Sequence, residues 1–481
     1  MSKLGFASSD PRVRLLNDRP VRKDAKFVLY FCQIFRRGED NAALSYAIMR
    51  ANELGLPCVV YEALRSDYPF ASDRFHQFVL EGAADTARVL AKRGIKHIFF
   101  LPRTPAEARG ILHEVAERAA LIVSDDFPTF VVKGHNENAA RRATCSYVVV
   151  DDCAVVPLSL FPKQEYAART IRPKFHRALE AWLRPIEEPK PKIDPPGKLD
   201  LPFKPIDFAT ADLPALVASC EIDHDVPPAV EFPGGSAAAA KRLRGFFSRL
   251  SGYDADRNEP SRNSTSHLSP YLHFGMISAR KIALETKEAE AGSEEDNAAF
   301  LEQLLVRRAL AYNFARTRPD HASYGALPDW AKATLAKHTP DPRPYLVTLE
   351  DLDAARTPDE LWNTAQLELR VRGVIHNYAR MLWGKLPITW MKRPADAHAA
   401  IVHLNDRYAL DGRDPNGYTN ISWCFGLHDR PWPERAIFGT VRSMTSRSAS
   451  TKLDLEGYLS NARGWRDALG LSQTSSQGAL F

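Results

Sequence analysis

The sequence predicts an α/β domain with a doubly wound parallel sheet, joined by a long Pro-rich linker to an all-α region. Short apolar runs alternate with helix-period segments over residues 1–185, and from residue 236 onward apolar residues recur at three- and four-residue spacing. Between these regions, eleven of the 34 prolines fall within residues 185–233, where they remove backbone donors and disfavour helices. We therefore divide the chain into residues 1–185, a linker over 186–235 and a helical region over 236–481.

The first region contains five short apolar runs that are rich in β-branched or aromatic residues, which favours strands over helices. They lie at Phe27–Cys32, Pro57–Glu62, Lys96–Leu101, Leu121–Ser124 and Ser146–Asp151. Helix-period segments separate them at Asn41–Leu54, Ser72–Lys92 and Thr104–Arg118. Strands that are apolar throughout and alternate with helices predict a parallel sheet covered on both faces.

The remaining elements follow from the same periodicities. In the linker, three apolar clusters favour an extended segment anchored on the surface over a disordered one: Leu201–Phe203, Ile206–Phe208 and Leu213–Val217. In the helical region, the predicted helices are Ala237–Leu250, Ala279–Ala289, Asn297–Phe314, Leu361–Arg370 and Val371–Leu386.

Composition excludes several classes of protein. The 481 residues are 44% hydrophobic and 26% charged, which are the proportions of a globular protein. No apolar run approaches the roughly 20 residues of a membrane span, and the amino terminus lacks the apolar core of a secretory signal. A net charge of +5 excludes a fully basic nucleic-acid-packaging protein but allows a local basic groove. The six cysteines show no C-x-x-C spacing, which predicts reduced thiols in a cytoplasmic protein.

Common catalytic and binding signatures are absent from the sequence. It lacks the motifs of P-loop NTPases, dinucleotide-binding folds, zincins and serine hydrolases. Residues 411–417 superficially resemble a calcium loop, but Gly417 at the sixth position places Gly412 first and Trp423 twelfth, where carboxylates are needed. No metal site is predicted.

Three segments of the chain carry polar and aromatic residues that could take part in chemistry. The first is residues 265–275, where Ser269 followed by Pro270 predicts a helix start with Ser269 as N-cap. Hydroxyls and free backbone N–H groups there would suit a phosphate at the amino end of the helix. Plain helix capping is the more frequent explanation of a Ser-Pro pair alone.

The second segment is a predicted helix that places His376, Arg380 and Trp383 on one face. Trp362 precedes Trp383 by 21 residues, which is about 31 Å along a continuous helix. The two indoles can therefore meet only if the chain folds back near Gly373. Trp390 follows seven residues later at a helix end. Without further context, three such tryptophans are more often part of a core.

The third segment combines residues 405–423 with residues 428–432 and is dense in Gly, Asp and Asn. This composition in an apolar context predicts a tight, well-ordered loop. A turn held by side-chain hydrogen bonds of Asx residues explains the pattern as well as a binding site does.

Together these segments resemble the photolyase/cryptochrome flavoprotein family, specifically its class II cyclobutane pyrimidine dimer photolyases. The resemblance covers nearly the whole chain. It rests above all on T-S-H-L-S-P-Y-L-H-F-G at residues 265–275 and L-N-D-R-Y-A-L-D-G-R-D-P-N-G-Y at residues 404–418. R-G-E-D-N-A-A-L at residues 37–44 and E-Y-A-A-R-T-I-R-P-K at residues 165–174 extend it into the first region.

The resemblance implies a buried FAD in the helical region. Arg380 and Asp411 would pair beside its isoalloxazine ring, and Asn405 would face the N5 edge of that ring. The full set of residues that match FAD-binding positions of the family is Tyr253, Thr265, Ser266, His267, Leu268, Ser269, Arg380, Asn405 and Asp411.

The activity that the resemblance implies is light-driven DNA repair. Excited FADH⁻ would pass one electron to a pyrimidine dimer flipped out of the duplex, the cyclobutane bonds would break and the electron would return. A tryptophan chain would carry electrons from the surface to FAD, with Trp383 nearest the flavin, Trp362 in the middle and Trp390 outermost. The residues that match contacts to the lesion or the DNA are Arg257, Gln303, Met381, Trp423, Arg430 and Trp432.

The expected partner is damaged double-stranded DNA, and no membrane partner is expected. The first region could hold an antenna chromophore, either a folate or a deazaflavin, as it does in many relatives. The sequence leaves the presence and identity of this chromophore open. The expected location is the cytoplasm, with nucleoid association while DNA is bound.

Three departures from the family pattern concern repair. Gln303 stands where the family string E-E-L-x-V-R-R-E-L has the Glu that contacts the dimer, and Ala309 replaces a second acid. A Gln cannot supply a proton or a charge, so about 1–3 kcal/mol of electrostatic help would be missing. The stretch between Trp423 and His428 is one residue shorter than usual. A cryptochrome-like blue-light receptor with the same FAD and tryptophan chain is therefore the alternative function.

Overall fold

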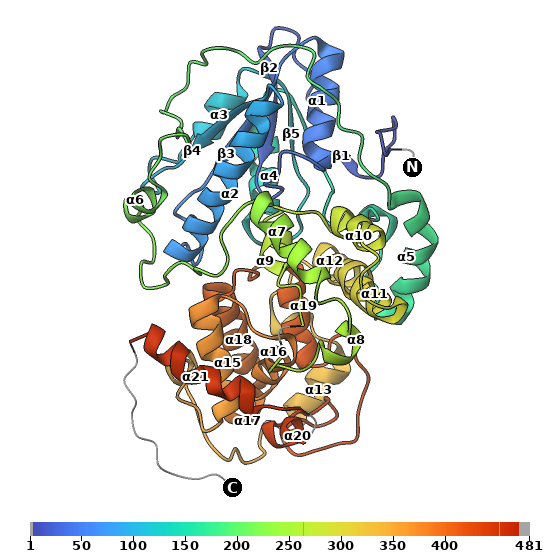
Figure 1. Ribbon diagram of the computed structural model, residues 1–481, viewed down its shortest axis with the longest axis vertical. Helices are drawn as coiled ribbons and strands as arrows, with labels where there is room; N and C mark the ends of the chain where they lie inside the picture. Colours follow the sequence, from blue (N-terminus) through green and yellow to red (C-terminus); the bar gives the residue numbers. More distant parts are fainter. Residues whose placement is uncertain (1–2, 263, 452, 471–481) are drawn as a thin grey trace. The chain divides into compact units, whose positions relative to one another are not determined.

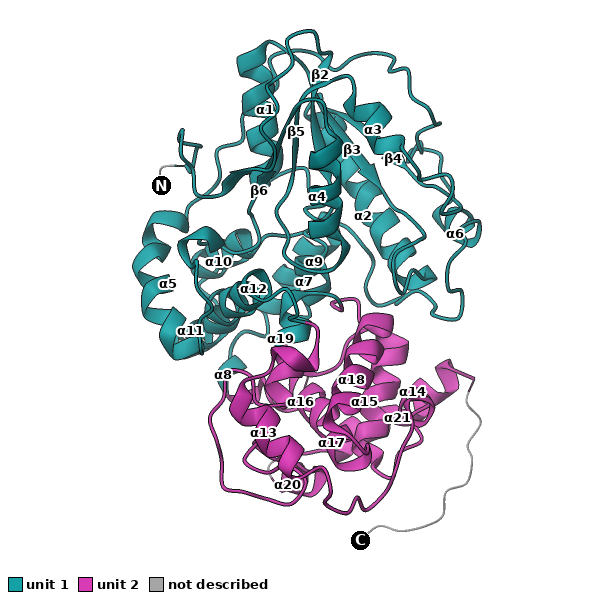
Figure 2. Cartoon of the chain, turned by 180° about the vertical axis from the view of Figure 1, so that it is seen from behind, with its two compact units in different colours: residues 1–254, 266–321, 413–419 teal, residues 255–265, 322–412, 420–481 magenta. Residues whose placement is uncertain are grey.

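The computed structural model describes residues 3–262, 264–451 and 453–470, which form two compact units. Unit 1 comprises residues 1–254, 266–321 and 413–419, and unit 2 comprises residues 255–265, 322–412 and 420–481 (Figure 2). Unit 1 thus contains the predicted α/β region, the linker and the first helices of the helical region.

Unit 1 is built on a six-stranded sheet with the strand order β1-β6-β5-β2-β3-β4 (Figure 1). β1 pairs antiparallel with β6, and the other four pairs of neighbours are parallel. The strands are β1 (Val13–Leu15), β2 (Phe27–Cys32), β3 (Cys58–Ala63), β4 (Lys96–Phe100), β5 (Ala119–Asp125) and β6 (Ser146–Val150). The predicted parallel sheet is confirmed. β1 is not predicted, because three residues carry too little periodic signal.

Helices cover both faces of this sheet, as the burial of all six residues of β2 requires. On one face lies α1 (Ala42–Leu54), which Asn41 caps by accepting a hydrogen bond from the backbone N–H of Leu44. On the other face, α3 (Ile111–Ala116) and α4 (Phe130–Arg142) contribute Val115 and Ala140 to the core.

The other helices of unit 1 surround this α/β core and continue into the helical region. They are α2 (Asp73–Lys92), η1 (Leu158–Leu160), α5 (Ala168–Trp182), α6 (Leu213–Ala218), α7 (Ser236–Phe247), α9 (Ser269–His273), α10 (Ala279–Glu288), α11 (Glu294–Leu301), η2 (Glu302–Arg307) and α12 (Arg308–Thr317). α8 (Tyr253–Asp256) crosses from unit 1 into unit 2 after residue 254.

Two sequence expectations for unit 1 are corrected. The predicted helix Thr104–Arg118 shortens to α3, because Gly110 with φ of +81° interrupts it. Ser269 is the first residue of α9 rather than its N-cap, a position that Leu268 takes.

The linker is anchored by the apolar residues that the sequence singles out. The ring of Phe203 lies 4.3 Å from that of Phe100, and the ring of Phe208 lies 5.1 Å from that of Phe99. Val217 in α6 is buried. The segment therefore covers the sheet instead of being disordered.

Unit 2 is helical throughout. Its elements are η3 (Tyr324–Ala326), α13 (Asp329–Lys337), α14 (Leu349–Asp353), α15 (Glu360–Arg372), α16 (Asn377–Lys385), α17 (Pro387–Trp390), α18 (Pro394–Tyr408), α20 (Ser446–Ser450) and α21 (Glu456–Ala468). α19 (Pro415–Cys424) crosses from unit 1 into unit 2 after residue 419. The predicted helix Val371–Leu386 is broken at Gly373, whose φ of +72° ends α15 in the left-handed conformation. His376 therefore caps α16 instead of lying within it.

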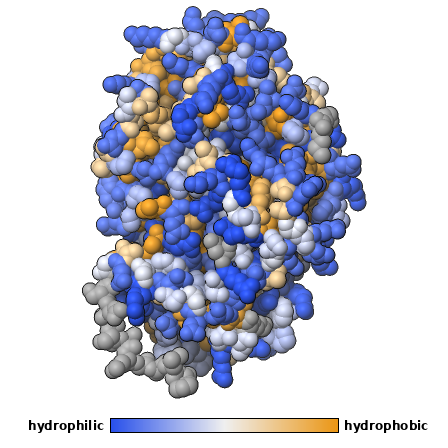
Figure 3. Space-filling model, in the orientation of Figure 1, coloured by the Kyte–Doolittle hydropathy of each residue, from blue (hydrophilic) through white to orange (hydrophobic). Residues whose placement is uncertain are grey.

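The surface of the chain is mostly polar on the face shown in Figure 3, where hydrophobic residues are scattered among hydrophilic ones. Within the part of the chain that the structure describes, no helix has both the length and the apolar character of a membrane span.

Candidate functional site

An ion pair between Arg380 on α16 and Asp411 after α18 lies in unit 2. The guanidinium binds the carboxylate through two bonds, with Nη2–Oδ1 at 2.9 Å and Nη1–Oδ2 at 3.2 Å. Both side chains are largely buried, with exposed fractions of 17% and 11%. Arg380 Nε is buried without a hydrogen-bond partner among the described residues. One donor of a mostly buried cation is thus left over for a ligand.

The loop that carries Asp411 is held against the end of α18. A Cβ on Gly412 would lie 2.6 Å from the carbonyl oxygen of Asn405, so only glycine allows this close approach. The backbone N–H of Leu410 donates to the carbonyl of Gly373 at 2.8 Å, which ties the loop to the turn between α15 and α16. Asn405 itself is buried, and its amide lies 3.4 Å from Asp406 Oδ1.

Three tryptophans that are distant in sequence form one buried cluster in unit 2. The rings of Trp362 and Trp383 stack at 6.3 Å with an interplanar angle of 13°, and Trp390 meets Trp362 edge-on at 5.9 Å. The chain folds back at Gly373, as the 21-residue separation of Trp362 and Trp383 requires. Trp383 Nε1 donates to Gln366 Oε1 at 2.9 Å, and Trp362 Nε1 donates to the carbonyl of Trp383 at 2.8 Å. Each indole N–H in this stacked pair therefore meets a neutral acceptor.

Two further tryptophans of unit 2, Trp423 and Trp432, are half-buried and lie among cations. The guanidinium of Arg442 is 5.8 Å from the ring of Trp423 and 5.0 Å from that of Trp432. Arg430 is 5.0 Å from the ring of Trp432, and Lys385 Nζ is 4.9 Å from that of Trp423. Arginines interleaved with aromatic rings are typical of surfaces that bind nucleic acids.

Sequence reasoning misses Lys385 and Arg442 in this group. Lys385 lies two residues after Trp383, on a different side of the predicted helix, and Arg442 belongs to no recognisable motif. Only their contacts with rings from other elements identify them. Of the remaining residues predicted to touch the lesion or the DNA, Met381 on α16 and Arg257 after α8 are half-buried in unit 2.

The other residues predicted to bind FAD are divided between the units. Thr265 belongs to unit 2, whereas Tyr253 and residues 266–269 belong to unit 1. Tyr253 is buried, with its ring edge-on to Phe246 at 5.8 Å. His267 has a φ of +51°, which is uncommon for a residue other than glycine. A phosphate-binding role for these residues stays a prediction.

Gln303 lies in the π-helical segment η2 of unit 1, and its side chain is exposed. Its neighbour Glu302 is paired with Arg172 at 2.7 Å and with Arg307 at 3.4 Å. Ala309 is fully buried in α12. Because Glu302 is held by two arginines, it is not free to replace the missing acid at Gln303. π-Helical segments are frequent at functional sites.

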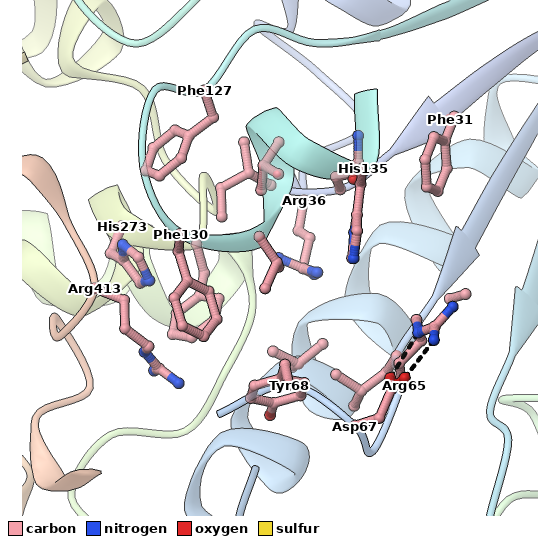
Figure 4. Close-up of a pocket in the computed structure, with 18 residues that line it drawn as sticks. Phe31, Arg36, Arg65, Asp67, Tyr68, Phe127, Phe130, His135, His273 and Arg413 are labelled. Atoms are coloured by element: carbon pink, nitrogen blue, oxygen red, sulfur yellow. Dashed lines mark hydrogen bonds and ion pairs between the residues drawn. The ribbon is translucent and has the colours of Figure 1, made fainter. Parts of the chain in front are cut away.

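A pocket of about 180 Å³ opens in unit 1 at the carboxyl ends of β2, β3 and β5. β2 and β5 are the neighbours at which the strand order reverses, and in open α/β sheets this is the usual place for a ligand. Figure 4 shows rings of Phe127, Phe130 and Tyr68 around the pocket together with Arg36 and Arg413.

Two polar groups in this pocket are strongly constrained. Arg36 donates through Nε to the buried Glu62 at 2.6 Å, while its Nη1 is buried without a partner in the described chain. His273 Nδ1 lies 3.1 Å from Asp414 Oδ2. Burial raises the pKa of Asp414, but the hydrogen bond and charge of His273 and the charge of Arg308 outweigh it and lower the pKa to about 2. The pocket thus offers aromatic walls and an unsatisfied cationic donor.

Comparison with known proteins finds similarity over nearly the whole chain. The DNA photolyase family model matches residues 28–192. A deoxyribodipyrimidine photo-lyase of Methanothermobacter thermautotrophicus is 37% identical over 458 residues, covering 95% of this chain and 99% of the relative.

Solved structures show the same fold at low sequence identity. A class III photolyase of Agrobacterium tumefaciens has a TM-score of 0.66 and 17% identity, covering 94% of this chain and 93% of that one. A cryptochrome of Synechocystis has a TM-score of 0.65 and 18% identity, covering 92% and 89%. Because repair enzymes and a cryptochrome share this fold, the fold alone does not choose between the two functions.

Proposed function

Because the chain belongs to the photolyase/cryptochrome family, we propose that it is a class II cyclobutane pyrimidine dimer photolyase that uses FAD and light to repair double-stranded DNA. The observation that carries the proposal is the mostly buried Arg380–Asp411 pair, which leaves one guanidinium donor unsatisfied in the same unit as the stacked tryptophans. The Methanothermobacter relative, which carries the photo-lyase name, matches the chain along almost its full length.

The residues of unit 2 fit the flavin part of FAD. Arg380 offers the buried Nε donor to a ring acceptor, and its charge favours an anionic ring. Asp411 orients the guanidinium through both oxygens, and the buried amide of Asn405 can bond to a ring nitrogen. FAD, when bound, supplies light absorption and the single electron that opens the cyclobutane ring of the dimer.

Trp423, Trp432 and their arginines fit the DNA side of the reaction. The half-buried ring of Trp423 can stack on a flipped-out base and replace part of the stacking that the base loses. Arg430 and Arg442 are exposed and can bind phosphates, so DNA affinity is expected to fall as salt rises.

The pocket at the carboxyl ends of β2, β3 and β5 fits an antenna chromophore. Its aromatic walls suit a planar ring system, and the unpaired Nη1 of Arg36 suits an acceptor or an anionic group on that ring. Both a folate and a deazaflavin combine a planar ring system with acceptor or anionic groups. Absorption beyond that of FAD in the spectrum of the purified protein identifies the occupant.

A direct repair assay tests the proposed function. Purified protein carrying FAD and kept under reducing conditions is mixed with a duplex that contains one thymine dimer, with and without blue light. We expect dimers to disappear only in the light, as measured by chromatography of the digested DNA. Equal dimer content in light and dark would reject photolyase activity. The cryptochrome-like function would then be tested by light-dependent changes in oligomeric state.

The exposed neutral side chain of Gln303 favours the receptor as second candidate, and a substitution separates the two functions. We expect Gln303→Glu to raise the repair rate about fivefold, because a carboxyl would restore about 1 kcal/mol of electrostatic help at the dimer. The measurement is the initial repair rate under saturating light. Gln164→Glu, which adds the same charge at another exposed position of unit 1, is the matched control. An unchanged rate in Gln303→Glu would contradict a catalytic deficit at this position.

A further inference from the structure

The tryptophans of unit 2 fall into two electrostatic environments. Trp423 has Lys385 Nζ at 4.9 Å and the Arg442 guanidinium at 5.8 Å from its ring. Within the described chain, no lysine or arginine lies over the rings of the Trp362, Trp383 and Trp390 cluster. In the stacked pair of that cluster, each N–H donates to a neutral oxygen.

Lys385 is a charged residue whose side chain is buried in unit 2. Its side chain is fully buried, and Nζ donates to the carbonyl of Cys424 at 2.8 Å. A buried ammonium with one hydrogen-bond acceptor and one aromatic face is costly to keep, since three donors leave water. Burial lowers the pKa of Lys385 to about 8, so the amine still carries its charge at neutral pH. Because burying this ammonium costs free energy, we look for a role of its positive charge next to Trp423.

The two environments have opposite effects on the loss of an electron. Oxidation of an indole places a positive charge on its ring, and nearby cations oppose that charge through Coulomb repulsion. The repulsion is strong where water is largely excluded, as it is around Lys385. Among the described residues, no lysine or arginine lies over the rings of Trp383 and Trp362, and their N–H groups point at oxygen acceptors. Trp423 should therefore be much harder to oxidise than the clustered indoles.

We propose that Lys385 and Arg442 protect Trp423 from one-electron oxidation, so that photoreduction of the flavin draws its electron through the Trp383 cluster. The proposal rests on the proposed function for its biological meaning. An indole of the cluster that loses one electron becomes a radical cation, and the electron would reduce the photoexcited oxidised flavin. The Nε1 protons of Trp383 and Trp362 stay on their rings, because both rings are fully buried and each N–H donates to a neutral oxygen. The ring that faces the lesion stays reduced and able to stack.

Trp432 lies in a different electrostatic environment from Trp423. Trp432 is also flanked by Arg430 and Arg442, each at 5.0 Å. However, Trp432 Nε1 donates directly to Asp429 Oδ1 at 3.3 Å, and this carboxylate offsets one of the two positive charges at that ring. Lys385 and Arg442 are positioning residues in this account, because they act through Trp423.

The first test needs no flavin and therefore stands even if the proposed function fails. Purified protein is exposed to photoexcited tris(bipyridine)ruthenium with persulfate, a one-electron oxidant, and oxidised tryptophan is measured for each peptide by mass spectrometry. We expect Arg442→Gln to raise oxidation at Trp423 about threefold, and the double variant with Lys385→Met to raise it about tenfold, relative to Trp383. Lys337→Met, which removes an exposed lysine paired with Glu434, is the matched control.

The second test uses the protein loaded with FAD. In a Trp383→Phe background, blue light should photoreduce the flavin poorly. Adding Lys385→Met and Arg442→Gln should restore part of the photoreduction and produce oxidised Trp423. Arg442 is exposed, so its single variant should fold even if the buried Lys385 substitution does not. Unchanged Trp423 oxidation in folded Arg442→Gln would overturn the proposal, whereas absent photoreduction in the unsubstituted protein would count only against the proposed function.

Discussion

Replacing Trp383 by Phe is expected to slow photoreduction of the bound flavin about 100-fold. Trp383 is fully buried and stacks on Trp362, and in the proposed function it is the tryptophan nearest the flavin. Phe keeps an aromatic ring in the core but is far harder to oxidise. The substitution also leaves the Gln366 oxygen without its donor, at a cost of about 1–2 kcal/mol in folding stability. The measurement is the rate at which flavin absorbance bleaches under blue light with an external reductant.

Trp465→Phe is the matched control for this loss. Trp465 lies on α21, with its ring 5.9 Å from that of Tyr458 and not in the cluster. In the Trp465→Phe variant, the flavin should be photoreduced at the same rate as in the unsubstituted protein, and the flavin content should be unchanged. Photoreduction that is equally fast in Trp383→Phe would show that electrons reach the flavin by another route.

Replacing Asp411 by Ala is expected to lower flavin occupancy about tenfold and stability by about 3 kcal/mol. The substitution leaves the Arg380 guanidinium, which is only 17% exposed, without its carboxylate. It also removes the two bonds that hold the guanidinium in place at the proposed flavin site. Flavin content is measured as the ratio of flavin to protein absorbance after purification. Thermal unfolding of the flavin-free protein measures the stability loss separately.

Asp396→Ala provides the control for a lost ion pair as such. Asp396 pairs with Arg393 at 2.6 Å, but that arginine is 69% exposed and solvent screens the pair. We expect a stability change below about 0.5 kcal/mol and full flavin content. Asp411→Asn keeps the shape of the side chain. Its flavin content and its stability should lie between those of Asp411→Ala and Asp396→Ala. Full flavin content in Asp411→Ala would exclude a role for this pair in binding the cofactor.

The sequence alone predicts most of the α/β fold and many candidate residues. Five parallel strands are recognisable because each is a short, continuously apolar run bounded by helix-period segments. Arg380 and Asp411 are named by the resemblance to the photolyase/cryptochrome family, and the structure brings them to 2.9 Å. The break in the helix around Gly373 is harder to place, because apolar spacing continues through it.

The electrostatic surroundings of the candidate site, by contrast, are decided only by tertiary structure. Lys385 meets Trp423 across 38 positions of sequence, and Arg442 reaches the same ring from a loop without a motif. The unpaired donor of Arg36 depends on how far Glu62 satisfies its guanidinium. Local patterns encode which elements form and which side they bury. Which charge lies against which ring depends on packing between those elements, and no local pattern contains that information.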